Sequence, residues 1–236
     1  MTTIQKIIDK ARAENRTFLL EPESKRIIKE LGIPTTDFAV AKSADEVKSV
    51  AKKVGFPLAM KIVSPQVIHK TDAGGVQLNI KTEKEAINAY NKIIANIKKH
   101  NPNAEVQGVL LEKMAEPADE LIIGVTRDPT FGPAVMFGFG GIFVEVLKDV
   151  AFRIAPITER DAMEMIHEIK ALPILLGARG GPKVNLQNIV DVLLKVSQLS
   201  IDYIQDILEV DLNPIFAYEN DLLVVDARII LTKKEE

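Results

Sequence analysis

The alternation of apolar and polar positions along the chain predicts short helices that alternate with strands. Helices are expected over Thr3 to Asn15 and from Glu21 or Pro22 to Leu31, followed by a strand at Phe38 to Ala41. Apolar residues at helical spacing from Val47 to Val54, after the potential N-cap Ser43, predict a third helix. This order of elements indicates a mixed α+β fold with antiparallel strands late in the chain.

The middle of the chain continues the pattern. Pro57 to Val63 is predicted as a buried strand, and Val76, Leu78 and Ile80 alternate with polar residues as in a half-buried strand. Thr82 with Glu85 forms a potential capping box for a helix that ends at Lys99. The core face of that helix is predicted to be Ile87, Tyr90, Ile94 and Ile97. Further strands are expected at 106–111, 120–126 and 133–139, and further helices at 159–170 and 186–201.

The clearest hairpin comes last, with strands at Ile207 to Ala217 and Leu222 to Leu231. If its turn is centred on Glu219 and Asn220, antiparallel pairing sets Asn213 opposite Asp226 and Asp211 opposite Arg228. These four polar side chains would share one face of the sheet. The opposite face would be apolar and able to cover a core, with Val210, Leu212, Val225, Ala227 and Ile229.

A histidine in the loop from Ser64 to Val76 is the first candidate for chemistry. His69 is one of three histidines in the chain, and imidazole can be neutral and nucleophilic near pH 7. Its neighbours Lys70 and Thr71, with the backbone amides at Gly74 and Gly75, could receive an arriving negative charge. A lone loop histidine is usually a solvated bystander, so the interpretation of His69 as a phosphate carrier depends on these surroundings. His100 and His167 are not expected to be catalytic.

Two further features are candidates for an anion or a metal. Lys61 is the single cation of a buried strand, which requires an anion such as a phosphate or a buried carboxylate. Asn213 and Asp226 could supply two oxygen ligands to Mg²⁺, which keeps much of its hydration shell. The simple alternative for that pair is the solvated face of a sheet. A glycine-rich segment at 137–145, followed by Arg153, could approach an anion but is typical of ordinary turns as well.

Composition narrows the possible functions. The 236 residues carry a formal net charge of −3 and lysines scattered among glutamates, which argues against nucleic acid as a partner. The sequence has no cysteine, so thiolate chemistry and cysteine metal sites are excluded. It has no apolar segment typical of a membrane span or a signal peptide, which predicts a soluble cytoplasmic protein.

These motifs and their order resemble the ATP-grasp domain of the nucleoside-diphosphate-forming acyl-CoA synthetases, over nearly the whole chain. The resemblance rests on Leu20-Glu-Pro-Glu-Ser-Lys, Met60-Lys-Ile-Val-Ser-Pro, His69-Lys-Thr-Asp-Ala-Gly-Gly, Gly138-Phe-Gly-Gly-Ile-Phe-Val-Glu, and Leu212-Asn-Pro with Val225-Asp-Ala-Arg. It implies two small α+β subdomains that clasp a nucleotide, at about 20–112 and 113–236. Within the family, the chain is most similar to the separately encoded β subunits of ADP-forming acetate–CoA ligases.

The resemblance also implies residue roles. His69 would take a phosphoryl group from a histidine of the partner subunit and deliver it to ADP, with Asp211 fixing the imidazole tautomer. The nucleotide would be bound by Lys61 at its phosphates, by Glu112 and the main chain of Met114 at its purine, and by Arg153. Mg²⁺ would be held by Asn213 and Asp226. One departure is Asn185, where the family usually has an aspartate, so no role is carried over to that segment or to Arg179.

The partner implied by the resemblance is a CoA-binding α subunit, in a hetero-oligomer expected to be α2β2. We expect the CoA-binding domain to be supplied by the partner, because this chain of 236 residues leaves no room for such a domain. Two alternatives stay open on the sequence alone. The chain could be the phosphotransfer subunit of a ligase for another acid such as succinate, or a nucleotide-binding regulatory subunit without turnover.

Overall fold

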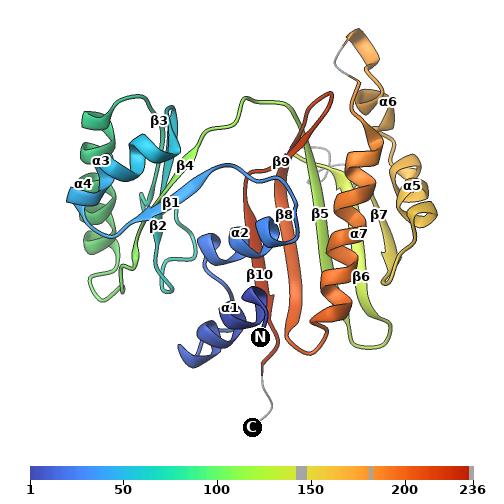
Figure 1. Ribbon diagram of the computed structural model, residues 1–236, viewed down its shortest axis with the longest axis horizontal. Coiled ribbons are helices and arrows are strands. Elements are labelled where there is room, and N and C mark those ends of the chain that lie inside the picture. Colours follow the sequence, from blue (N-terminus) through green and yellow to red (C-terminus); the bar gives the residue numbers. More distant parts are fainter. Residues whose placement is uncertain (142–147, 181–182, 234–236) are drawn as a thin grey trace. The chain divides into compact units, whose positions relative to one another are not determined.

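The computed structural model describes residues 1–141, 148–180 and 183–233, and the chain forms two compact units (Figure 1). The large unit comprises Met1–Leu19, Glu23–Thr35 and Pro117–Glu236. The small unit comprises Leu20–Pro22 and Thr36–Glu116. Residues 23–35 thus group with the C-terminal half of the chain, whereas the sequence interpretation placed them in the N-terminal subdomain.

The small unit is a four-stranded antiparallel sheet with two helices. Its strand order is β1 (Phe38–Ala41), β4 (Gly108–Lys113), β2 (Leu58–Val63) and β3 (Val76–Ile80). The helices α3 (Ala44–Val54) and α4 (Glu83–His100) pack against each other and against this sheet (Figure 1). Every paired strand runs antiparallel, as expected for a fold in which hairpins and short crossovers connect neighbouring strands.

Strand alternation divides the residues of this sheet between a core face and a polar cluster. Met60 and Ile62 of β2 belong to the apolar core that the two helices cover. Lys61, between them, therefore points to the opposite face of the sheet. Glu112 of β4 pairs with Ala59 in the register and lies on the same face as Lys61.

Two details of the sequence prediction for this unit are wrong. Leu78 is 56% exposed, because β3 carries one extra residue between Ile80, which pairs with Leu58, and Gln77, which pairs with Met60. This bulge breaks the strict alternation that the sequence suggested. In α4 the buried residues are Ala86, Ala89, Tyr90, Ile93 and Ile97, so the core face is centred one position earlier than predicted.

The large unit is built on a six-stranded antiparallel sheet in the order β10, β8, β5, β6, β7, with β9 also paired to β8. The strand bounds are β5 (Asp119–Asp128), β6 (Gly132–Phe139), β7 (Val150–Ile154), β8 (Ile207–Ala217), β9 (Leu222–Val224) and β10 (Ala227–Leu231). The edge strand β7 is absent from the sequence prediction.

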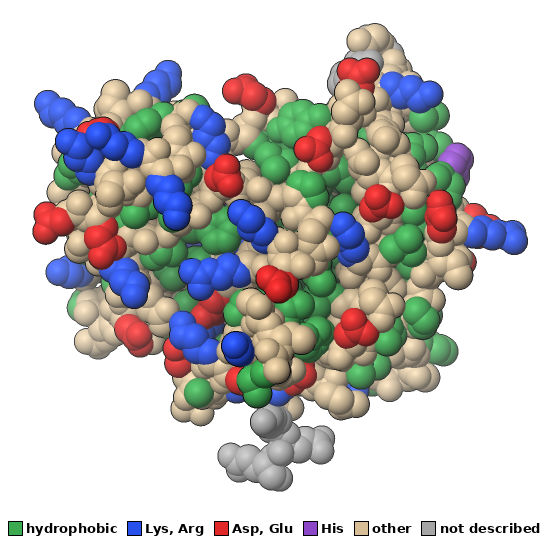
Figure 2. All heavy atoms as spheres, viewed as in Figure 1, with side chains coloured by type: hydrophobic (Ala, Val, Ile, Leu, Met, Phe, Trp, Pro, Cys, Tyr) green, Lys and Arg blue, Asp and Glu red, His purple; other side chains and the backbone are tan. Residues whose placement is uncertain are grey.

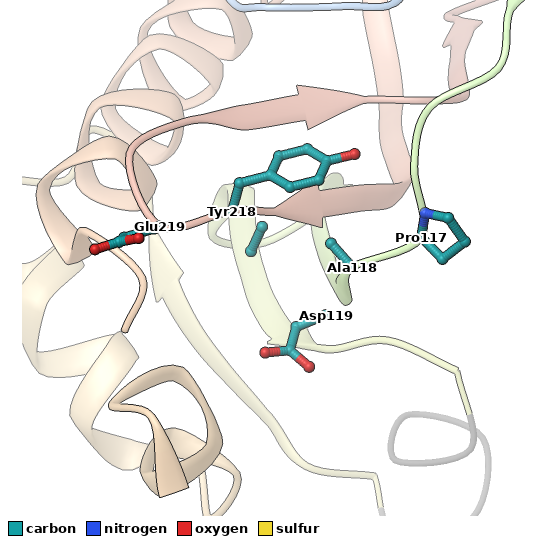
Figure 3. A pocket seen from close by; sticks show the side chains of 6 residues that line it. Pro117, Ala118, Asp119, Tyr218 and Glu219 are labelled. Atoms are coloured by element: carbon teal, nitrogen blue, oxygen red, sulfur yellow. The ribbon is translucent and has the colours of Figure 1, made fainter. Parts of the chain in front are cut away.

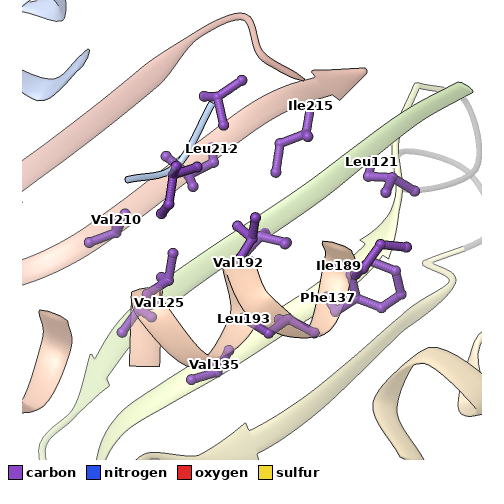
Figure 4. Packing of buried hydrophobic residues seen from close by; sticks show 14 of the residues in the cluster. Leu121, Val125, Val135, Phe137, Ile189, Val192, Leu193, Val210, Leu212 and Ile215 are labelled. Carbon is purple, nitrogen blue, oxygen red and sulfur yellow. The ribbon is translucent and has the colours of Figure 1, made fainter. Parts of the chain in front are cut away.

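Five α-helices accompany this sheet in the described part of the chain: α1 (Thr3–Ala13), α2 (Glu21–Glu30), α5 (Glu159–Glu168), α6 (Leu172–Leu175) and α7 (Leu186–Asp202). The first turn of α2 contributes its residues Glu21 and Pro22 to the small unit. The 17-residue helix α7 packs against β5 and β6. Figure 4 shows its Ile189, Val192 and Leu193 beside strand residues such as Phe137 and Val125. This apolar core fixes one face of the sheet and leaves the polar residues of β8 to the other.

The C-terminal hairpin has the predicted register. Asp211 pairs with Arg228 and Leu212 with Ala227 on one side of an interruption, and Ile215 pairs with Val224 on the other. The same register continues across the interruption, so Asn213 lies level with Asp226. The interruption contains the cis peptide bond between Asn213 and Pro214, and it shifts the phase of burial in β8 by one residue.

The phase shift moves the apolar face of the hairpin. Before the interruption the buried residues are Val210 and Leu212 in β8, opposite Ala227 and Ile229 in β10. Val225, which the sequence placed on that apolar face, is only half-buried because it lies within the interruption itself. Its N–H donates to the Pro214 carbonyl oxygen at 3.0 Å.

Candidate functional site

A cluster of charged side chains, with two buried carboxylates and two partly exposed lysines, lies on the polar face of the small-unit sheet. Lys61 Nζ is 2.6 Å from Glu21 Oε1 and 3.1 Å from Glu112 Oε2. Lys70 Nζ is 3.0 Å from the second oxygen of Glu21. The Glu21 and Glu112 side chains are only 3% and 2% exposed. Lys61 therefore meets the buried carboxylates that the sequence gave as one of its two possible partners.

Glu112 is held from two sides. Its Oε1 accepts a hydrogen bond from the Thr36 hydroxyl, and its Oε2 faces the Lys61 ammonium. The carboxylate predicted to line a purine pocket is therefore occupied by protein donors in this conformation. Its contact with a purine stays a prediction.

His69 lies on an exposed loop that is anchored on both sides. Val67 and Ala73 are buried in the small-unit core, whereas His69 and the neighbouring Ile68 are exposed. The Gly75 N–H donates to the Lys70 carbonyl oxygen at 2.7 Å, and the Ala73 N–H donates to that of His69 at 3.2 Å. The imidazole is thus presented to solvent by a backbone that is fixed close to it.

The sequence prediction for the glycine amides of this loop is wrong. The Gly74 N–H donates to the Thr71 carbonyl oxygen at 2.9 Å, and the Gly75 N–H donates to the Lys70 carbonyl oxygen. These amides close the loop instead of facing an incoming anion. The glycines are needed for space, because a Cβ at Gly75 would lie 2.6 Å from Ile62 Cγ2. Lys70 is the remaining cationic neighbour of His69.

Asn96 of α4 ties the loop to the helix, since its Nδ2 donates to the Gly74 carbonyl oxygen at 2.9 Å. We expect Asn96→Ala to reduce the free energy of unfolding by about 1 kcal/mol and to speed tryptic cleavage after Lys70 severalfold. Urea unfolding and timed digestion of the full chain would measure both effects. Asn91→Ala, at an exposed position of the same helix, serves as the control. Equal cleavage rates in the two variants would show that the tether does not hold the loop.

The other two predicted nucleotide-binding residues, Met114 and Arg153, also have protein partners. The Met114 N–H donates to the Pro57 carbonyl oxygen at 2.9 Å, so that N–H is not offered to a purine. In the large unit, the Arg153 guanidinium forms a two-point ion pair with Glu168, one contact of which measures 3.0 Å. A phosphate bound by Arg153 would have to displace Glu168. Both residues stay predicted nucleotide contacts.

The large unit brings together the three hairpin residues to which the sequence analysis gave a role in the site. Asp211 and Asn213 alternate on one face of β8, and Asp226 follows β9 at the level of Asn213. The Asp226 Oδ1 atom accepts a hydrogen bond from the N–H of Ala227 at 2.7 Å. Among the described residues, no group of three or more His, Asp or Glu side chains is arranged to hold a metal ion. A cation at Asn213 and Asp226 would therefore keep most of its ligands from water or phosphate, as Mg²⁺ does.

The electrostatics of Asp211 fit a cation at this place. Burial raises the pKa of the Asp211 carboxyl, and the nearby charges of Glu209 and Asp226 raise it further, whereas Arg228 opposes the shift. Within the described part of the chain, Asp211 Oδ1 is buried without a hydrogen-bond partner. A positive ion beside these carboxylates would relieve both conditions, so the residues present are suited to a divalent cation.

Two charged residues at the site were not predicted. Glu21 bridges the two lysines of the small unit, and the only sequence signal for it was the need of Lys61 for an anion. Lys25 is fully buried, and its Nζ donates to the Val225 carbonyl oxygen at 2.9 Å, one residue before Asp226. Both belong to the Glu-Pro-Glu-Ser-Lys motif at the start of α2.

The glycine-rich segment gives less support to an anion site. A Cβ at Gly138 would lie 2.8 Å from the Asp149 carbonyl oxygen, and one at Gly140 would lie 3.1 Å from Glu120. These two glycines therefore allow close packing of protein backbone. The second half of the motif, at 142–145, lies outside the described residues.

A pocket of about 440 Å³ opens in the large unit where β5 begins and β8 ends (Figure 3). It is lined by Pro117, Ala118, Asp119, Ala217, Tyr218 and Glu219. Burial raises the pKa of the Asp119 carboxyl. None of the predicted site residues lines this pocket. On the face viewed in Figure 2, lysine and arginine side chains are interspersed with aspartate and glutamate, so a phosphate must be recognised locally.

Comparison with known proteins shows the protein family to which this chain belongs. The family model of the ATP-grasp domain matches residues 10–231. The chain is 53% identical over 227 residues to the β subunit of ADP-forming acetate–CoA ligase I of Pyrococcus furiosus, covering 96% of this chain and 97% of that subunit. The chain belongs to this family of ATP-grasp proteins, the ADP-forming acetate–CoA ligases.

Solved structures of acetyl-coenzyme A synthetases have the same fold as this chain. A dinucleotide-forming acetyl-coenzyme A synthetase 1 of Ca. Korarchaeum cryptofilum, in complex with coenzyme A and Ca-AMPCP, has a TM-score of 0.92 and 47% identity. Another structure of that enzyme contains Mg-AMPPCP and has a phosphohistidine segment pointing towards the nucleotide-binding site, with a TM-score of 0.86 and 43% identity. Both comparisons cover 98% of this chain and 100% of the other. Within the described residues of this chain, no helix is both long and apolar enough to cross a membrane.

Proposed function

We propose that this chain is the nucleotide-binding β subunit of an ADP-forming acetate–CoA ligase, in which His69 accepts a phosphoryl group and transfers it to ADP. The observation that carries the proposal is the exposed His69 imidazole on an anchored loop, next to a lysine held in a buried charge cluster. The 53% identity to a β subunit of such a ligase gives the reaction.

The chemistry assigned to His69 is nucleophilic. A neutral imidazole nitrogen attacks the phosphorus of the phosphohistidine on the partner subunit, so that one N–P bond forms as the other breaks. In the second step the terminal phosphate oxygen of ADP attacks the same phosphorus, and the electron pair of the N–P bond returns to His69. Lys70 would stabilise the charge of the phosphoryl oxygens, and Lys61 would stabilise that of the nucleotide phosphates. Arg153 is a further candidate for the nucleotide.

The hairpin of the large unit is proposed as the metal site. Asn213 and Asp226 would hold Mg²⁺, which neutralises phosphate charge when bound. Asp211 would fix the tautomer of the His69 imidazole through a hydrogen bond. Glu112 and the main chain at Met114 would contact the purine.

The partner in this proposal is a CoA-binding α subunit that makes the acyl phosphate, and the assembly is proposed to be α2β2. A cytoplasmic location belongs to the same proposal, because the substrates would be nucleotides and CoA thioesters. Cell fractionation would test the location, and the mass of the native complex would test the stoichiometry.

Separating the two subunits tests the proposal directly. We expect the purified chain alone to bind ADP but to make no ATP from acetyl-CoA, ADP and phosphate. Addition of the cognate α subunit should restore ATP formation. Turnover of acetyl-CoA by this chain alone would contradict the two-subunit proposal. A complex that prefers succinyl-CoA, or that binds nucleotide without turnover, would identify one of the alternative functions instead.

A further inference from the structure

Glu21 is a buried carboxylate that joins two cations from different parts of the small unit. Its Oε1 lies 2.6 Å from Lys61 Nζ in β2, and its Oε2 lies 3.0 Å from Lys70 Nζ in the His69 loop. The Glu21 side chain is 3% exposed. Such short contacts in a buried place are charge-assisted hydrogen bonds, whose geometry is fixed more tightly than that of a surface ion pair.

The cluster joins ammonium groups to carboxylates of the small unit. Two ammonium groups, Lys61 and Lys70, face two carboxylates, Glu21 and Glu112. Lys61 is shared between both carboxylates, whereas Glu21 is the carboxylate that the structure places on Lys70. Removal of the Glu21 charge would take a carboxylate away from both lysines. The position of Lys70 would be affected most, because Lys61 retains Glu112.

Lys70 follows His69 directly and is held at both of its ends. Its carbonyl oxygen accepts the Gly75 N–H at 2.7 Å, and its ammonium group is bound by Glu21. The peptide that joins His69 to Lys70 is restrained as well, because its N–H donates to the Ile68 carbonyl oxygen at 3.1 Å and its carbonyl oxygen accepts from the Ala73 N–H at 3.2 Å. The imidazole itself is exposed. The contact with Glu21 fixes the Lys70 ammonium group before any phosphate arrives.

We propose that Glu21 is a positioning residue for phosphoryl transfer, which holds the ammonium group of Lys70, the residue after His69 in the sequence, and gives it up to the phosphoryl group. The inference rests on the proposed role of His69. A phosphoryl group on the imidazole brings new negative charge next to Lys70, and its oxygens compete with Glu21 Oε2 for the same ammonium. After transfer the contact with Glu21 forms again. Glu21 makes no bond to phosphorus and takes no proton in this sequence.

The step to be measured is the transfer between ATP and His69. The imidazole nitrogen forms a bond to the γ-phosphorus, the bond from that phosphorus to the β,γ-bridging oxygen breaks, and ADP leaves with its electron pair. Glu21→Gln keeps the shape of the side chain and removes its charge. With the complete complex, Mg²⁺ and γ-labelled ATP, we expect His69 to be labelled about 10²-fold more slowly, as misplacement of a positioned group can cause.

ADP binding gives a second readout that a merely structural role would not produce. In Glu21→Gln, Lys61 is no longer shared with Glu21, so we expect ADP affinity to be retained or to increase. A variant that is simply misfolded would lose affinity together with transfer. Calorimetry with Mg-ADP distinguishes the two cases.

A matched control is available on the same helix. Glu23 is as buried as Glu21 and pairs with Arg16 at 2.8 Å in the large unit. Glu23→Gln should lower thermal stability while leaving the labelling rate of His69 unchanged.

A charge-balanced double variant separates positioning from simple neutralisation. Glu21→Gln combined with Lys70→Gln removes one negative and one positive charge, so the net charge of the cluster stays the same. This double variant should be more stable than Glu21→Gln alone if the single variant is unstable. We expect transfer to stay slow in the double variant, because no cation remains beside His69. Recovery of the labelling rate would overturn the inference, since Glu21 would then act only as a counter-ion.

The two proposals can fail separately. If the wild-type complex shows no label on His69, the proposed function is wrong whatever Glu21 does. If the wild type is labelled and a folded Glu21→Gln variant is labelled equally fast, or loses ADP affinity in parallel with transfer, only the role of Glu21 is refuted.

Discussion

Replacement of His69 by alanine is expected to abolish ATP formation from acetyl-CoA, ADP and phosphate in the complete complex. Loss of a covalent nucleophile removes the route itself, so the rate should fall by several orders of magnitude, on the order of 10⁴-fold or more. The alanine variant should still bind ADP, because the imidazole lies on an exposed loop and contributes nothing to the buried cluster of Lys61 and Glu112.

The chemistry of the bound phosphate gives an independent measurement. The wild-type chain should acquire an acid-labile, base-stable phosphate that maps to His69, and the alanine variant should acquire none. The other two histidines are controls: His100 ends α4, and His167 Nδ1 contacts the Met163 carbonyl oxygen. Alanine at either position should leave the phosphate label intact. Normal turnover by His69→Ala would rule out the phosphocarrier.

The second large effect is expected at the hairpin. Asp226→Ala should weaken Mg²⁺-dependent binding of ADP and lower turnover by about 10²-fold to 10⁴-fold, since a bound metal ion stabilises the transition state by several kcal/mol. Asn213→Ala should act in the same direction, because Asn213 in β8 lies level with Asp226, which stands between β9 and β10. Titration of ADP at several Mg²⁺ concentrations measures the effect.

Glu219→Ala is the control for this hairpin, since Glu219 is exposed at the turn and its backbone contacts are kept. It should leave the Mg²⁺ dependence unchanged. The metal assignment would be refuted if Asp226→Ala bound ADP with the affinity and the Mg²⁺ dependence of the wild type.

Local and regular features could be predicted from the sequence. The bounds of β1 and β8 agree with the prediction residue for residue, and the pairing of Asp211 with Arg228 follows from the position of the turn. Hairpin register depends on residues that are close in the sequence, so it could be predicted from the sequence. The position of Lys61 as the single cation of an apolar segment likewise predicted an anion close to it, and Glu21 and Glu112 lie there.

Features that depend on distant partners could not be predicted. Glu21 contacts a lysine 40 positions away and another 49 positions away, and no periodicity marks such a pair. The amides of Gly74 and Gly75 were predicted to be available to an anion, but they donate to carbonyl groups of the same loop. Every residue has such a carbonyl group, so the sequence does not show which of them accepts a hydrogen bond. The exposure of Leu78 depends on a bulge that alternation alone does not reveal.

The interruption of the C-terminal hairpin has a consequence for insertions and deletions. Beyond Asn213 and Pro214 the buried positions of β8 resume at Ile215 and Ala217, and those of β9 are Leu222 and Val224. The phase of burial shifts on both strands at the same level. One residue gained or lost on a single strand would therefore move the apolar side chains of that strand, at the tip of the hairpin, to the opposite face of the sheet. A viable length change in this hairpin must therefore occur on both strands together.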